Sequence, residues 1–186
     1  MTPTLYERLA GDAWQEVPEA VRRAHAGEGP LQARGVFRIQ HGRGYLARLL
    51  ARLLRLPSPS AATRVQLHVT PSAHGERWER TFGSRRLVTL QHEAPGSLLG
   101  ERFGPLELRF QLRPQAGVLS YLQEEAALCF GRSRLVLPPW LAPRVSATES
   151  TTEAARRSRT VVDVSLPLLG LLIRYEGELE VEEESA

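Results

Sequence analysis

The stretch LELRFQLR, residues 106–113, indicates the fold most clearly. Apolar residues occupy every second position, and charged or amide side chains stand between them. Because successive side chains of a β-strand point to opposite faces, this alternation predicts a strand with one face buried. The same period recurs in residues 65–70 and 173–181, and turn residues separate such segments. The chain therefore predicts about nine to eleven strands at hairpin spacing, which is typical of a meandering antiparallel sheet.

One segment breaks this period and predicts a helix. In GYLARLLARLLRLP, residues 44–57, leucines recur at helical spacing on one side and arginines lie on the other. We expect this amphipathic helix, about residues 44–56, to pack its leucines on the concave face of the sheet. Residues 4–25 predict one or two further helices, with Pro18 in the first turn of the second.

Together these elements predict an α+β fold that is predominantly antiparallel β. A sheet of this size tends to curl, because strand twist accumulates and bare edges invite aggregation. We therefore expect a curved sheet or half-barrel, and the pattern leaves open whether it closes into a barrel. No stretch has linker composition, so residues 1–186 are predicted to form a single domain.

The composition narrows the class of protein. A hydrophobic fraction of 42% is ordinary for a folded globular chain. The N-terminal residues lack the apolar core of a secretory signal, and no stretch approaches the roughly 20 apolar residues that span a bilayer. The single Cys129 has no partner for an internal disulfide. We therefore expect a cytoplasmic protein.

Charge is unevenly distributed along the chain. All 24 basic residues are arginines, and residues 29–75 contain arginines but no Asp or Glu. Such a zone is either a solvated face or a surface that attracts phosphates, nucleic acid or anionic lipid. Phe37 and Tyr45 are its only aromatic residues, which disfavours nucleic-acid binding.

Catalytic and metal-binding motifs are scarce. The chain has no GxSxG motif, and Cys129 lies among apolar residues, as expected of a buried core cysteine. Gly42 and Gly44 predict a tight turn into the helix, because glycine is the usual residue in such turns. The chain has no lysine, so these glycines do not belong to a phosphate-binding loop of the Walker type. His68 and His74 bracket a turn, but nothing clearly completes a metal shell. We expect no cofactor, no metal site and no assigned catalytic residue.

The apolar concave face of such a sheet is either filled by its own side chains or suited to an apolar or amphiphilic small molecule. Trp78 and Phe82 share a face, with Arg80 between them. Aromatic residues are expected to line a cavity, and arginines to grip an acidic head group. The candidate ligand-binding residues are His25, Arg43, Arg48, Trp78, Arg102, Phe103, Trp140 and Tyr175.

Several segments, in this order, resemble a known family. They are LYERLAGDAW (5–14), GRGYLARLLARLLRLP (42–57), ERFGPLELRF (101–110), LPPWLAPRV (137–145) and SLPLLGLLIRYEGELE (165–180). The chain thus resembles the bacterial domain-of-unknown-function family 4166 over essentially its whole length. Since members occur alone or behind saccharopine-dehydrogenase-like domains, the resemblance implies a stand-alone copy, with a dehydrogenase-like protein as a partner. It implies no established activity.

Three functions remain open from the sequence. The leading hypothesis is a non-enzymatic module that binds an apolar or amphiphilic, lipid-like small molecule. The first alternative is an enzyme or dehydrogenase-accessory domain that uses His25 and arginines. The second is a peripheral protein that attaches to a membrane surface through the Leu/Arg helix.

Overall fold

The computed structural model describes residues 3–25, 29–152 and 156–182. Most of them lie in strands, whose bounds are β1 (Leu31–His41), β2 (Ser60–Ser72), β3 (Gly75–Phe82), β4 (Arg85–Ala94), β5 (Leu98–Phe103), β6 (Leu106–Gln115), β7 (Val118–Phe130), β8 (Ser133–Val136), β9 (Arg144–Thr151), β10 (Ser158–Leu166) and β11 (Gly170–Val181). The helical segments are α1 (Leu5–Ala10), the 3-10 helix η1 (Gly11–Glu16), α2 (Glu19–His25) and α3 (Tyr45–Leu53).

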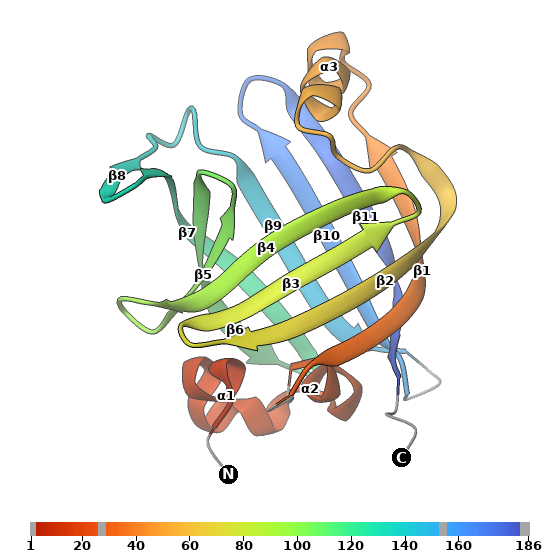
Figure 1. Cartoon of the computed structure of the whole chain (residues 1–186), viewed down its shortest axis with the longest axis vertical. Helices are drawn as coiled ribbons and strands as arrows, with labels where there is room; N and C mark the ends of the chain where they lie inside the picture. The colour runs from red at the N-terminus through yellow and green to blue at the C-terminus, as the bar shows by residue number, and fades with distance from the viewer. Residues whose placement is uncertain (1–2, 26–28, 153–155, 183–186) are drawn as a thin grey trace.

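The strands form one antiparallel sheet in the order β6-β5-β4-β3-β2-β1-β11-β10-β9-β7-β8. Strand β6 also pairs with β7, so 10 strands close into a barrel and β8 extends beside the upper part of β7 (Figure 1). The predominantly antiparallel β-fold is confirmed. The predicted open half-barrel is wrong. Strand β6 pairs with β7 as a hairpin and β1 pairs with β11 from the other end of the chain, so 10 strands close on themselves.

The alternation in the sequence decides which side chains enter the barrel. On β2, Val65 and Leu67 are buried while Gln66 is exposed. On β6, Leu108 and Phe110 are buried inside, as expected from the 106–113 pattern. Alternate residues of neighbouring strands therefore meet in one continuous interior.

One end of the barrel is covered by α1, η1 and α2 (Figure 1). Thr4 begins α1 with a capping box: its hydroxyl accepts from the Glu7 amide, and the Glu7 carboxylate accepts from the Thr4 amide. Tyr6 and Trp14 are buried in the same core as Leu99 and Phe110 of the barrel. The predicted N-terminal helices thus form the floor of the barrel.

Helix α3 lies at the opposite end, on the rim between β1 and β2 (Figure 1). The helix is confirmed, but its predicted packing through leucines on the concave face is wrong. Its buried residues are Ala47 and Ala51, whereas Leu53 is 70% exposed. The small alanine face allows the helix to rest closely on the barrel wall. Of its leucines, Leu50 borders the cavity, whereas Leu46 and Leu53 are exposed. No helix within the described ranges has the length and apolarity to cross a membrane.

Candidate functional site

The barrel contains a cavity of about 420 Å³. Its wall is mainly aliphatic and aromatic, and includes Leu54 beside α3 at the open end and Leu108 and Val162 on the strands. Small-molecule sites in proteins usually measure roughly 300–1,000 Å³ and place a few polar groups in an apolar wall. The volume and lining both match that description.

Polar side chains enter this cavity from four neighbouring positions on the inner face. They are Arg80 on β3, Thr89 and Gln91 on β4, and Glu101 on β5. Each shares the strand period of apolar residues that also line the cavity, such as Phe82, Leu87 and Phe103. These polar groups therefore point inward because the pleat directs them there.

Arg80 is the cation of the cavity. Its Nη1 donates to Thr89 Oγ1 at 3.0 Å and lies 3.5 Å from Glu101 Oε1, and its guanidinium sits 5.0 Å from the centre of the Trp78 ring. Burial alone would lower the pKa of Arg80, but Glu101 and other nearby acidic groups raise it above its ordinary value. Arg80 is therefore charged, and its side chain stays 19% exposed beside the cavity.

A second polar pair lies towards the floor. His25 Nε2 is 2.6 Å from Glu149 Oε2, and the His25 ring stacks on Tyr6 with a centroid distance of 3.8 Å. Burial alone would raise the pKa of Glu149, but His25 and Arg80 lower it below its ordinary value. Glu149 is therefore a carboxylate that lines the cavity, while His25 is buried behind it.

Tyrosine hydroxyls connect these groups across the floor. Tyr121 donates to the Tyr6 hydroxyl at 3.4 Å, and Tyr6 donates to Gln91 Oε1 at 2.8 Å. Burial raises the pKa of Tyr6 and of Tyr121 well above its usual value, and raises that of Tyr175 to about 12. These hydroxyls are therefore neutral hydrogen-bonding groups at physiological pH.

The structure places four of the predicted site residues in or beside the cavity. Trp78, Phe103 and Tyr175 line it. His25 lies behind Glu149 and is only 3% exposed. The sequence reasoning did not select Glu149, which shares the strand period of the lining residues Val145 and Ala147 on β9.

The other four lie outside the cavity lining. Arg43 and Arg48 are exposed at α3, and Trp140 is 63% exposed in the connection from β8 to β9. Arg102 stands between Glu101 and Phe103, which both line the cavity, so the pleat places Arg102 on the outer face of β5.

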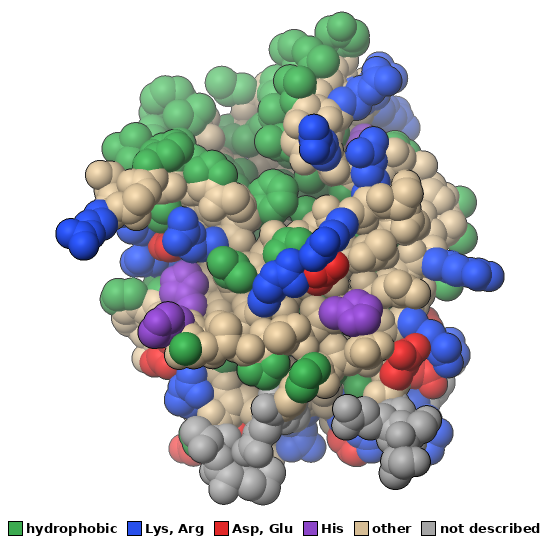
Figure 2. Space-filling model, in the orientation of Figure 1, with side chains coloured by type: hydrophobic (Ala, Val, Ile, Leu, Met, Phe, Trp, Pro, Cys, Tyr) green, Lys and Arg blue, Asp and Glu red, His purple; other side chains and the backbone are tan. Residues whose placement is uncertain are grey.

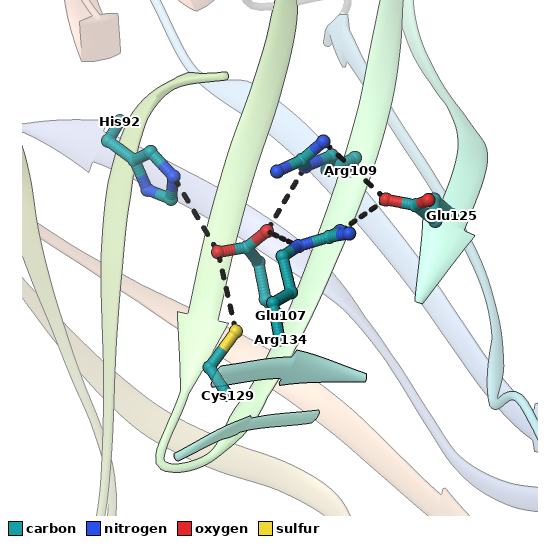
Figure 3. A network of polar contacts seen from close by, with 6 residues as sticks. All are labelled: His92, Glu107, Arg109, Glu125, Cys129 and Arg134. Carbon is teal, nitrogen blue, oxygen red and sulfur yellow. Dashed lines mark hydrogen bonds and ion pairs between the residues drawn. The ribbon is translucent and has the colours of Figure 1, made fainter. Parts of the chain in front are cut away.

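A separate polar network lies on the outer wall, where β8 meets β6 and β7 (Figure 3). Glu107 accepts from Arg109 Nε at 3.1 Å, from Arg134 Nε at 3.0 Å and from the Cys129 thiol at 3.8 Å. Arg134 also pairs with Glu125. The network thus ties β8 to the barrel wall.

Contacts in the same network shift the pKa values of Glu107 and His92. Burial alone would raise the pKa of Glu107, but Arg134 and Arg109 lower it. Burial lowers the pKa of His92, and Glu107 only partly offsets this. No group of three or more His, Cys, Asp or Glu residues in the described ranges is arranged to hold a metal ion.

Comparison with solved structures finds a protein of unknown function from the DUF3598 family of Nostoc punctiforme PCC 73102, with 11% sequence identity and a TM-score of 0.40. The alignment covers 82% of this chain and 46% of that chain, so this chain spans less than half of the length of the solved protein. No curated protein matches the chain. The sequence model of DUF4166, a domain of unknown function, matches residues 17–179, and the chain therefore belongs to the DUF4166 family.

Proposed function

We propose that this protein binds an apolar or amphiphilic small molecule inside its barrel, with the apolar part towards the open end and a polar head towards the floor. The observation that carries the proposal is the cavity of about 420 Å³, whose wall is apolar except for a group of converging polar side chains. Transfer of an alkyl chain from water into a cavity with such a wall is favourable by about 0.8 kcal/mol per buried methylene.

The charges around the cavity favour an uncharged head group. Arg80 already has Glu101 as a partner at 3.5 Å, and Glu149 adds a second carboxylate to the lining. An acidic head would bring a further negative charge into this partly desolvated site, which is costly without a free cation. A hydroxyl, carbonyl or amide instead accepts from Arg80 and, where it carries a hydrogen, donates to Glu149.

Binding is tested with a fluorescent long-chain alcohol whose emission rises in an apolar environment. The decisive variant is Ala147→Phe, which fills part of the cavity because Ala147 lines it. The matched control is Ser146→Phe, since Ser146 is the exposed neighbour on the same strand. We expect the wild type and the control to bind alike and the Ala147→Phe variant to bind at least about tenfold more weakly.

The head group is tested by competition. A long-chain alcohol and the fatty acid of equal length are used to displace the fluorescent molecule from the wild type. The proposal expects the alcohol to displace it at the lower concentration, because the acid meets Glu101 and Glu149. Absence of any binding by the wild type, or equal loss in the Ala147→Phe and Ser146→Phe variants, would refute binding inside the barrel.

A further inference from the structure

We infer that the open end of the barrel docks on an anionic lipid bilayer, so that the mouth of the cavity faces the membrane. The evidence for docking is the charge and the exposed apolar side chains at this end, which do not depend on what the cavity binds. Only its consequence, that the bilayer supplies the ligand, rests on the proposed function.

Charge at this end is of one sign. The segments at this end are residues 42–59 with α3, 83–84, 104–105, 131–143 with β8, and 167–169, and they contain no Asp or Glu. Their charged residues are Arg43, Arg48, Arg52, Arg55, Arg132 and Arg134. Arg134 pairs with Glu107 and Glu125, whereas no carboxylate of the described ranges pairs with the others. The open end therefore presents free guanidinium groups.

Large apolar side chains are exposed at the same end, and we call them the apolar rim. Their exposed fractions are high: 80% for Leu168, 70% for Leu53 and 63% for Trp140. The apolar rim consists of Leu46, Leu53, Phe130, Leu135, Trp140 and Leu168. Figure 2 shows hydrophobic side chains gathered over α3 and over the region of β8, with basic side chains beside them. Exposed apolar groups of this size mark interaction surfaces.

Helix α3 has the arrangement of an interfacial helix. Ala47 and Ala51 face the barrel, so Leu46 and Leu53 project away from it. At 100° per residue, Arg48 and Arg52 fall on a third side of the helix, between the alanine face and Leu49. An amphipathic helix with leucines on one face and arginines beside them binds in the plane of a membrane surface through apolar burial and attraction to anionic lipids.

A bilayer fits this surface better than a second copy of the chain. Two copies that met rim to rim would bring their unpaired arginines together without any acidic partner from the connections, and like charges oppose such an interface. Anionic head groups instead offer each arginine a partner. Trp140 is suited to the same place, because tryptophan is favoured at the boundary between lipid and water.

The docking surface and the cavity share one helix. Leu50 on α3 and Leu54 directly after it line the cavity, while Leu46 and Leu53 belong to the apolar rim. A docked barrel thus has its mouth against the lipid. An amphiphile passes from the bilayer into the cavity without crossing bulk water.

The experiment uses the full chain and vesicles of phosphatidylcholine alone or with a third of phosphatidylglycerol. Co-sedimentation measures binding, and tryptophan emission reports insertion. Trp140 is exposed, whereas Trp14 and Trp78 are buried, so a blue shift on vesicle addition reports Trp140. We expect binding and a blue shift with the anionic vesicles only, and loss of the shift in the Trp140→Phe variant.

The variants separate the apolar rim from the rest of the wall. Leu46→Glu with Leu53→Glu is expected to weaken vesicle binding at least about tenfold, and Arg48→Glu with Arg52→Glu about fivefold or more for each arginine removed. The matched control is Leu90→Glu, because Leu90 is an exposed leucine of β4 outside the rim. We expect Leu90→Glu to bind as the wild type does, and circular dichroism checks that every variant is folded.

The outcomes distinguish the two proposals. The docking would be overturned if the wild-type protein did not bind anionic vesicles, or if the rim variants bound them as Leu90→Glu does. A dimer of the wild-type protein that the rim variants abolish would also overturn it. The Ala147→Phe variant is expected to keep vesicle binding and to lose only the alcohol. Normal docking without any bound amphiphile in the cavity would sustain the docking and refute the proposed function.

Discussion

His25 Nε2 lies 2.6 Å from Glu149 Oε2, although the two residues are 124 positions apart in the chain. The contact joins α2 of the floor to β9 of the barrel wall. It also holds a carboxylate at the edge of the cavity, with the buried imidazole behind it. One pair therefore links the stability of the floor to the electrostatics of the candidate site.

Replacement of Glu149 by Gln removes the charge and keeps the shape. The pKa of Glu149 in the folded protein lies below its ordinary value of 4.5, so its charged form stabilises the fold. That contribution is complete above the ordinary value and is lost as the pH falls through the folded pKa. We expect Glu149→Gln to lower the free energy of unfolding by about 1–3 kcal/mol at neutral pH.

Urea denaturation at a series of pH values measures this difference. It is expected to shrink once the medium becomes more acidic than the ordinary carboxyl value. Glu178→Gln is the control, because Glu178 and Arg157 form an exposed pair at 3.7 Å. A gap between wild type and Glu149→Gln that widens on acidification would contradict the assignment.

Arg80 and Glu101 are coupled inside the barrel. Loss of one partner leaves the other charge beside an apolar wall, which costs roughly 3–5 kcal/mol for fully buried pairs and less here, where the cavity adjoins. We expect Arg80→Met to destabilise the protein by about 2–3 kcal/mol and Arg80→Met with Glu101→Gln to recover more than half of that. Thermal unfolding of the four proteins in the cycle measures the coupling, and strictly additive effects would argue against it.

The outer network around Glu107 is expected to hold β8 in place (Figure 3). The charged Glu107 accepts from two arginines, so Glu107→Gln weakens both contacts. We expect a loss of about 1–3 kcal/mol in stability and faster amide hydrogen exchange in residues 127–136, with little change in β1–β3. Unchanged exchange in that segment would show that strand pairing alone holds β8.

Gly42 and Gly44 flank Arg43 and provide a matched pair of alanine substitutions. A Cβ on Gly42 would lie 1.8 Å from the carbonyl oxygen of Leu171, whereas one on Gly44 would meet nothing within 4 Å. Gly44 also has a φ of −65°, which any residue adopts. We expect Gly42→Ala to cost about 1–3 kcal/mol and to loosen α3, and Gly44→Ala to be neutral. Limited proteolysis in α3 and urea denaturation measure both effects, and equal behaviour of the two variants would contradict the close contact seen at Gly42.

Most strands were predictable because they carry a two-residue period, as Leu108 and Phe110 illustrate, whereas β8, with no such alternation, was not predicted. Barrel closure was not, since it depends on the pairing of β1 with β11, two strands from opposite ends of the chain, which no local pattern encodes. The packing of α3 was predicted wrongly for a related reason. Periodicity shows that a helix is amphipathic, but Ala47 and Ala51 were small enough to form the face that meets the barrel.

The polar half of the cavity was only partly predictable. Arg80 stands two residues from Trp78 and from Phe82, so the strand period places it on their face. The same reading applies to Glu101 beside Phe103. The two-residue alternation of β3 and of β5 does not show that Arg80 and Glu101 lie 3.5 Å apart. That contact depends on how β3, β4 and β5 pair side by side in the curved wall.

The most direct measurement is a crystal structure with a long-chain alcohol that carries bromine at its far end. The account predicts anomalous density for bromine inside the barrel, between Leu54 and Leu106, and the hydroxyl within hydrogen-bonding distance of Arg80. Bromine found only on the outer surface, or a barrel interior filled by its own side chains, would contradict it.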